Sequence, residues 1–154
     1  PGRRHDTGTR MVGNPELEEF PDCFGCGARN PSGLKLSLRL DDGDLTTEFV
    51  PRGEHQGWPG IVHGGIITSL LYEVLENLPY YQGVVTMMKS MDTRFRRAAR
   101  TGAKIFATAR LVDRSERTMN VSAKLTDEDG ELIAEGDAVL VILSRNQKEK
   151  LGLA

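Results

Sequence analysis

The chain has 154 residues, of which 38% are hydrophobic and 27% are charged, and its formal net charge is −2. This is the size and composition of one globular domain. The small net charge gives no general electrostatic reason to expect nucleic-acid binding, and no apolar run approaches the ~20 residues that span a bilayer. Two cysteines are too few for the disulfide framework of a secreted mini-domain, so we expect a cytoplasmic protein.

The first segment, residues 1–20, is polar and lacks hydrophobic periodicity, so we predict a flexible tail before a single domain at 21–144. Cys23 and Cys26 follow in a glycine-rich, turn-forming stretch. A tetrahedral zinc site needs four ligands, and the chain has no second cysteine pair and no histidine pair nearby. We therefore interpret this C-x-x-C motif as a structural turn and predict no metal, with a metal shared across a dimer as the alternative.

Alternating leucines at residues 34–40 predict a half-buried strand. Asp41-Asp-Gly43 is a hairpin signal, and residues 45–50 return as a second strand. The next segment, residues 51–59, is a loop that carries His55, Gln56 and Trp58.

A helix is predicted at residues 66–78, because its apolar residues recur at helical spacing and Pro79 follows. Glu73 lies just outside one edge of the apolar stripe, and Asn77 lies one turn further along the same edge. Tyr72 lies beyond the opposite edge.

Four further strands are expected at about 85–96, 104–113, 119–126 and 132–143, followed by a polar C-terminal tail at 145–154. These segments are mostly joined by short turns, which favours antiparallel pairing. The order of two strands, one helix and four strands predicts an α+β fold. In it, one long central helix is wrapped by a curved antiparallel sheet of five to six strands.

The motif Gly60-Ile-Val-His-Gly-Gly65 stands at the start of the predicted helix. Open amides and the positive end of the helix dipole favour an oxygen that carries or develops negative charge. Glu73 lies about two turns further along the same helix. An oxyanion site together with a carboxylate points to acyl chemistry.

These motifs resemble those of the hotdog-fold acyl-CoA thioesterases of the PaaI-like, phenylacetate-pathway type, over about residues 23–143. The residues that carry the resemblance are His63-Gly64-Gly65, Asn30-Pro31, Gly33-Leu34, and Arg94-Phe95-Arg96 leading into Thr101-Gly102. The resemblance implies hydrolysis of acyl-CoA thioesters without a metal or organic cofactor, coenzyme A being part of the substrate. It also implies a homodimer or a dimer of dimers, with the long helices back to back.

The spacing within the helix agrees with a dimer. Gly64 and Glu73 are nine positions apart, which is ~13 Å along one helix, so one thioester carbon cannot touch both. Two helices related by a two-fold axis would bring Gly64 of one chain near Glu73 of the other. The resemblance implies this shared site.

The chain departs from the resemblance at the catalytic acid. Many relatives carry an Asp or Glu seven residues after the second glycine, where this chain has Tyr72, and Glu73 follows one residue later. If Glu73 does not replace that acid, the protein binds acyl-CoA without hydrolysing it.

On this interpretation the catalytic residues are Glu73 as base or nucleophile, Gly64 and Gly65 as oxyanion donors, His63 as helix cap, and Asn77 as a water-positioning group. The substrate-binding candidates are His55, Gln56, Trp58 and Tyr72, with Arg94, Arg96 and Arg97 for the CoA phosphates. Strand alternation places Arg94 and Arg96 on one face and Arg97 on the other.

Two other functions compete with hydrolysis. The first is a hotdog dimer that binds an acyl-CoA without turnover. The second is a hotdog dehydratase or hydratase, which uses an Asp and a His a few residues apart. No Asp precedes His63 at such a spacing, which disfavours the second.

Overall fold

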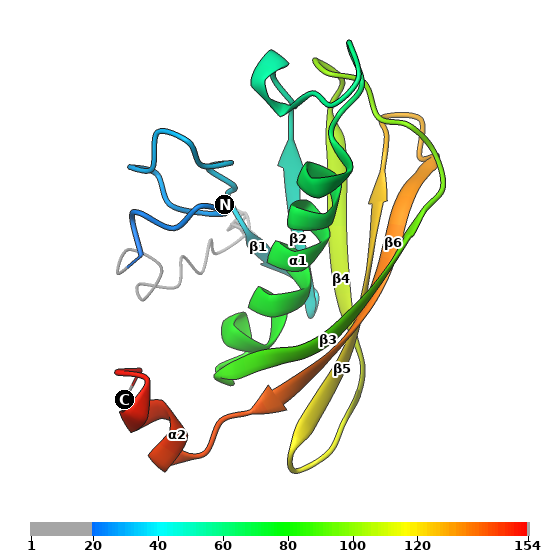
Figure 1. Cartoon of the computed structure of the whole chain (residues 1–154). Helices are drawn as coiled ribbons and strands as arrows, with labels where there is room; N and C mark the ends of the chain where they lie inside the picture. The colour runs from blue at the N-terminus through cyan, green and yellow to red at the C-terminus, as the bar shows by residue number, and fades with distance from the viewer. Residues whose placement is uncertain (1–19, 154) are drawn as a thin grey trace, which may run out of the picture.

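The structure is a computed structural model that describes residues 20–153. One antiparallel sheet curves around a single long helix (Figure 1). In chain order the elements are β1 (Arg39–Asp41), β2 (Asp44–Phe49), the 3₁₀ turn η2 (Gly53–His55), α1 (Gly64–Tyr81), β3 (Thr86–Phe95), β4 (Ile105–Arg114), β5 (Thr118–Thr126), β6 (Leu132–Ile142) and α2 (Arg145–Lys150).

The sheet has six strands in the order β1-β2-β4-β5-β6-β3, and every neighbouring pair is antiparallel. Asp42 and Gly43 turn the β1–β2 hairpin with φ values of 48° and 85°, as an Asp-Gly turn requires. β3 is an edge strand, because β6 is its only neighbour within the described chain. The predicted α+β architecture and the four long strands are confirmed.

The core lies between α1 and the concave face of the sheet. Helical residues at the predicted spacing are fully buried there, each leucine contributing about 1.5–3 kcal/mol of transfer free energy. The helical contribution is Leu70, Leu71, Val74, Leu75 and Leu78, and the sheet contributes Leu45, Ala109, Val121, Leu125 and Leu140 among others.

The prediction that Pro79 ends the helix is wrong. α1 runs to Tyr81 with Pro79 inside its last turn, where the side chain is buried. Proline removes one helical hydrogen bond, but the turn still closes, because the Gln82 amide donates to the carbonyls of Leu78 and Pro79 at 3.1 and 3.0 Å.

The expected strand at residues 34–40 is also largely wrong, since only its last two residues belong to β1. Leu34 and Leu36 are buried as expected, but their amides donate to the carbonyls of Phe24 and Gly25 at 2.8 and 3.0 Å. This segment therefore pairs with the C-x-x-C turn instead of a strand, and Lys35 between them has a left-handed φ of 52°.

The two ends of the described chain lie on the side of α1 that faces away from the sheet (Figure 1). The N-terminal segment before β1 covers the upper part of this side, and α2 lies near the end of α1. The predicted C-terminal tail therefore contains a short helix, whereas all but the last residue of the predicted N-terminal tail falls outside the described residues. No helix in the described range is long and apolar enough to span a membrane.

Candidate active site

The start of α1 is capped by His63. Its Nδ1 accepts a hydrogen bond from the Gly65 amide at 2.8 Å, and its carbonyl accepts from the Ile66 amide at 2.9 Å. One of the two expected oxyanion donors is therefore already engaged, whereas the exposed Gly64 amide has no acceptor among the described residues. Gly64 is the more available donor.

The two glycines have different surroundings. A Cβ on Gly65 would lie 2.9 Å from His63 Nδ1, so the cap itself requires glycine there. A Cβ on Gly64 would lie 3.7 Å from the ring of Phe95, which is an ordinary contact. The end of β3 therefore reaches the N-terminus of α1.

The loop before α1 holds the start of this helix in place through His55. His55 is only 5% exposed. Its Nδ1 accepts from the Arg52 amide at 3.0 Å, and its carbonyl accepts from the His63 amide at 2.9 Å. Burial, and then the charge of Arg52, lower the pKa of His55. His55 therefore braces His63 through its carbonyl, and its buried ring leaves little surface for contact with a substrate.

The other two loop candidates are exposed. Gln56 Oε1 accepts from the Gly60 amide at 3.0 Å and so closes the loop. Trp58 is 81% exposed, which leaves a large apolar surface near the helix start. Only Trp58 of the three loop residues offers such a surface.

Glu73 lies in the interior instead of on a solvated helix face. Its side chain is 9% exposed and packs on Gly25 so closely that a methyl group there would overlap the carboxyl group. Asn77 Nδ2 donates to Glu73 Oε2 at 3.2 Å and to the Glu73 carbonyl at 2.8 Å. Burial raises the pKa of Glu73, and the bond from Asn77 opposes part of that rise. The structure thus brings together the predicted carboxylate and its amide partner.

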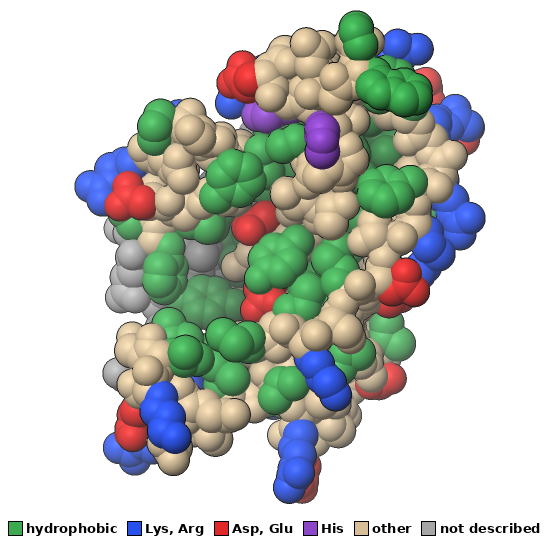
Figure 2. Space-filling model, viewed as in Figure 1, with side chains coloured by type: hydrophobic (Ala, Val, Ile, Leu, Met, Phe, Trp, Pro, Cys, Tyr) green, Lys and Arg blue, Asp and Glu red, His purple; other side chains and the backbone are tan. Residues whose placement is uncertain are grey.

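A cavity of about 260 Å³ opens beside this pair, between α1, the start of β3 and the two terminal segments. It is lined by Phe20, Cys23, Cys26, Glu73, Glu76, Asn77, Tyr80, Val85, Thr86 and Leu153. Figure 2 shows acidic side chains set among hydrophobic ones on this face of the molecule. A desolvated acid beside a mostly apolar cavity is suited to proton transfer.

Sequence reasoning missed Glu76 and Thr86, which both line this cavity. Glu76 Oε2 and Thr86 Oγ1 are buried and have no hydrogen-bond partner among the described residues. Burial raises the pKa of Glu76 to about 7. A signal was present, because Glu73, Glu76 and Asn77 share a helical face at positions i, i+3 and i+4.

The two cysteines also border the cavity. Sγ atoms of Cys23 and Cys26 and a carboxylate oxygen of Glu73 all lie within 4.8 Å of one another. Burial, and then the neighbouring Cys23 thiol, raise the pKa of Cys26 to about 12. Nothing in the sequence pattern indicated that this turn meets Glu73, because the two are about 50 residues apart.

Tyr72 lies close enough to Glu73 and Glu76 to feel their charge, but outside the cavity. Its side chain is 42% exposed and does not line the cavity, as expected for a residue beyond the opposite edge of the apolar stripe. Partial burial and then the charge of Glu76 raise the pKa of Tyr72.

The arginine cluster is paired with carboxylates. Arg94 bonds Glu135 at 3.1 Å and Asp137 at 2.7 Å. Arg96 shares Glu135 at 2.8 Å, which agrees with the predicted common face of these two arginines. Arg97 pairs separately with Glu131 at 3.2 Å. None of the three lines the cavity beside Glu73.

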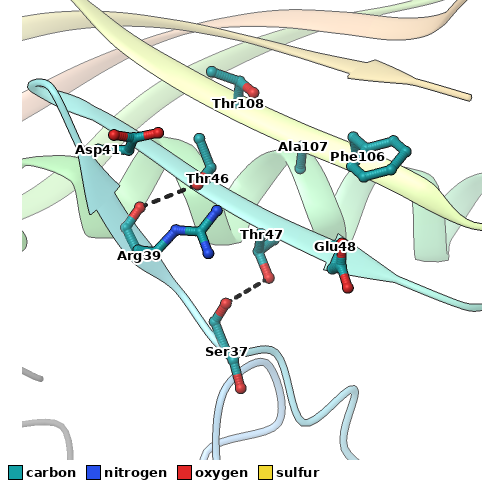
Figure 3. Close-up of a pocket in the computed structure, with 9 residues that line it drawn as sticks. All are labelled: Ser37, Arg39, Asp41, Thr46, Thr47, Glu48, Phe106, Ala107 and Thr108. Carbon is teal, nitrogen blue, oxygen red and sulfur yellow. Dashed lines mark hydrogen bonds between the residues drawn. The ribbon is translucent and has the colours of Figure 1, made fainter. Parts of the chain in front are cut away.

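A larger hollow of about 410 Å³ lies where β1 and β2 meet β4 (Figure 3). Two threonine hydroxyls in it bond backbone carbonyls, Thr47 to Ser37 at 2.9 Å and Thr46 to Arg39 at 3.3 Å. Its two acids, Asp41 and Glu48, are exposed, and Glu48 pairs with Lys104 at 3.4 Å. This hollow has solvated acids and no desolvated one, so the smaller cavity is the better candidate.

Comparison with known proteins identifies the family. Residues 61–152 match the family model described as the thioesterase-like superfamily. The match covers more than half of the chain, so the protein belongs to the thioesterase-like superfamily. A comparison with the curated proteins finds no match.

Solved structures share the fold. A crystal structure of a thioesterase superfamily protein superimposes with a TM-score of 0.74 at 24% identity, over 79% of this chain and 60% of that one. This chain therefore spans about 60% of the length of that relative. A mutant of the phenylacetic acid degradation protein PaaI from Thermus thermophilus gives a TM-score of 0.66 at 24% identity, over 71% and 95% of the two chains.

A third structure, from Streptococcus mutans, is bound to acetyl CoA. It has a TM-score of 0.67 at 14% identity, and covers 71% of this chain and 89% of that one. The fold is thus the hotdog fold, with PaaI among the structures that share it.

Proposed function

We propose that the protein hydrolyses an acyl-CoA thioester to the free acid and coenzyme A. The observation that carries the proposal is the carboxyl group of Glu73, 9% exposed and held by Asn77 beside the cavity, in a chain of the thioesterase-like superfamily. The acetyl CoA bound to the Streptococcus mutans structure supports this ligand class.

The edge strand β3 supports a homodimer. Its ten residues have one neighbouring strand in the described chain, and proteins seldom leave so long an edge unpaired. In an antiparallel pairing of two β3 strands centred on Ser90 and Met91, Phe95 of one protomer would face Thr86 of its partner. A two-fold axis makes both contacts at once.

This pairing would also complete the site. Phe95 lies next to Gly64, whereas Thr86 lines the cavity of Glu73. The helix start of one protomer would therefore approach the cavity of the other. One dimer would hold two such sites, each combining the amide of one chain with the carboxylate of its partner.

The proposed chemistry divides between these groups. The Gly64 amide donates to the thioester oxygen, and the Gly65 amide joins it when it leaves His63 Nδ1. Loss of one such donor costs on the order of 10²–10³ in rate. In one route Glu73 takes a proton from the water that attacks the carbonyl carbon, and returns that proton to the CoA thiolate as the C–S bond breaks. In the other route Glu73 attacks the carbon itself, the thiolate leaves and takes a proton from water, and a second water hydrolyses the acyl-Glu73 anhydride to release the free acid.

Environment suits Glu73 to this role. Burial raises the pKa of Glu73, so the ionised group is a stronger base than a solvated carboxylate. The apolar wall of the cavity, including Val85 and Phe20, keeps the carboxylate desolvated.

The test is a panel of acyl-CoA thioesters of different acyl groups, incubated with the purified protein and assayed for free thiol. We expect thiol release with at least one class of ester. Tight binding of CoA esters without thiol release would instead support the alternative, an acyl-CoA-binding module. The dimer proposal is tested by light scattering, where a monomer would contradict it.

A further inference from the structure

The turn that carries the two cysteines is built against Glu73. Two thiols and one carboxylate oxygen lie within 4.8 Å of one another, although the thiols come from the N-terminal segment and the carboxylate from the middle of α1. The Cys26 thiol lies beside that of Cys23. Three groups of metal-ligating type thus converge from two elements.

Glycines make this close approach possible. A Cβ on Gly25 would overlap the Glu73 carboxyl group, and a Cβ on Gly27 would collide with the backbone of Cys23 and Pro21. The Gly27 amide closes the turn on the Cys23 carbonyl at 2.9 Å. The turn is therefore shaped in advance around the carboxylate.

The backbone further holds this turn in place. Its carbonyls at Phe24 and Gly25 accept hydrogen bonds from the buried residues Leu34 and Leu36 at 2.8 and 3.0 Å. The cluster is therefore anchored to the core and does not depend on a loose loop.

Charge at the cavity favours a cation. Its lining contains two carboxyl groups and two thiols, but no Lys, Arg or His among the described residues. The ion pairs of the described chain also leave out Glu73 and Glu76. One oxygen of Glu76 is buried there without a partner. The polar groups of this cavity thus have no positive charge to balance them.

We propose that Cys23, Cys26 and Glu73 bind one zinc-class divalent ion, with a fourth position open to the cavity for water. Two thiolates and a carboxylate form a donor set that suits Zn²⁺, and sites with three protein ligands keep one open position. Tetrahedral zinc with these ligands needs donor separations of about 3.5–3.8 Å, so the donor atoms, which lie within 4.8 Å of one another, have to approach by at most about 1.3 Å.

Asn77 is suited to orient the ligating carboxylate of Glu73 without contacting the ion itself. It donates to Glu73 Oε2 at 3.2 Å, and such outer-shell bonds orient a ligating carboxylate. The cysteine turn, expected from the sequence to be structural only, thereby gains its third ligand from α1 of the same chain.

Ion binding has a consequence for hydrolysis. Glu73 cannot hold an ion and accept a proton from water at the same time, so the ion-loaded form is the inactive form of the hydrolase. This consequence rests on the proposed function, whereas the binding of the ion does not.

The test is a titration of the full chain with Co²⁺ in a phosphine reductant, followed by displacement with Zn²⁺. We expect one Co²⁺ per chain, with the near-ultraviolet charge-transfer absorption of thiolate ligands and the visible bands of tetrahedral cobalt. Zn²⁺ should remove both signals. This readout does not involve turnover, so it separates failure of the metal site from failure of the proposed hydrolysis.

Three variants assign the ligands. Cys26→Ser should weaken Co²⁺ binding at least about 100-fold, since even outer-shell losses cost 10–100-fold. Glu73→Gln should weaken binding but keep the thiolate absorption. Glu128→Gln, which changes a carboxyl group on an exposed turn outside the cavity, should bind within about threefold of the parent.

Far-ultraviolet circular dichroism checks that each variant folds. If Cys26→Ser does not fold, the Glu73→Gln variant tests the proposal in its place. Absence of stoichiometric binding, absence of thiolate absorption, or equal binding by the parent and Glu73→Gln would overturn the proposal.

Discussion

The start of α1 and its polar edge two turns later assemble their chemistry in different ways. At the start, His63, Gly64 and Gly65 are neighbours in the sequence, and the cap forms within a single turn. At the edge, Glu73 meets Gly25 and two cysteines that are about 50 residues away. The first region is exposed and the second is buried. A local motif can therefore be recognised from the sequence, whereas the environment that tunes the carboxylate cannot.

The largest effect is expected on thioester turnover, when the buried carboxyl group of Glu73 is removed. Glu73→Gln keeps the size of the side chain but removes the base, so we expect thioester turnover to fall at least about tenfold. Fold and dimer should remain intact. Steady-state thiol release measures the loss. Glu128→Gln makes the same change on an exposed turn and serves as the control. Normal turnover in Glu73→Gln would remove this residue from the mechanism.

The second largest effect is expected on stability, when a methyl group is placed against the same buried region. Gly25→Ala places a methyl group on the Glu73 carboxyl group, so we expect a loss of about 1–3 kcal/mol in the free energy of unfolding. Urea denaturation measures it. Gly53→Ala is the matched control, because a Cβ there has nothing within 4 Å. Equal stability of the two variants would mean that the N-terminal segment does not pack on Glu73.

The helix start offers the corresponding local test. Gly65→Ala would bring a Cβ to 2.9 Å from His63 Nδ1 and disrupt the cap, at a cost of about 1 kcal/mol. Gly64→Ala meets only the Phe95 ring at 3.7 Å and should leave the melting temperature nearly unchanged. Thermal unfolding compares the melting temperatures of the two variants. A lower melting temperature for Gly64→Ala than for Gly65→Ala would contradict the assigned cap.

A pH titration sharpens the contrast between buried and exposed acids. The folded pKa of Glu76 is about 7, above its ordinary value of 4.5. The unfolded chain therefore loses this proton first, and stability falls as pH rises from about 4.5 through about 7. Glu76→Gln should be more stable than the parent at pH 8 by about 1 kcal/mol, since the group is only partly buried.

At pH 4.5 that advantage should largely disappear, because the folded parent then keeps the Glu76 carboxyl group neutral. Chemical denaturation at the two pH values measures the difference. A constant difference across this range would show that Glu76 titrates as an exposed acid.

The smallest effect concerns the exposed arginines. Arg96, paired with Glu135 at 2.8 Å, is half exposed and proposed to contact the CoA phosphates. Arg96→Ala should raise KM for CoA esters up to about fivefold, in keeping with the ~1 kcal/mol of an exposed charge contact. KM for pantetheine esters, which lack those phosphates, should not change. Equal effects on both substrates would argue against phosphate contact.

Local patterns in the sequence determined most of the elements. Apolar spacing predicted α1, because burial of one face imposes a helical period. Long β-branched segments joined by short turns predicted the four long strands. The alternation at residues 34–40 and the helix stop at Pro79 were misleading. There, hydrogen bonds to the C-x-x-C turn replaced a strand ladder, and the closing bonds of Gln82 carried the helix past the proline.

The candidate site likewise has a part that local sequence determines and a part that distant contacts determine. The sequence alone determined the glycine-rich helix start and placed Glu73 and Asn77 on one edge of α1. Only the tertiary structure decided that Glu73 is desolvated, that Glu76 shares its cavity, and that two thiols lie beside it. The physical reason is that a cap is made by neighbours in the chain. Desolvation depends on which distant segment covers the residue, and no periodicity of the helix records that segment.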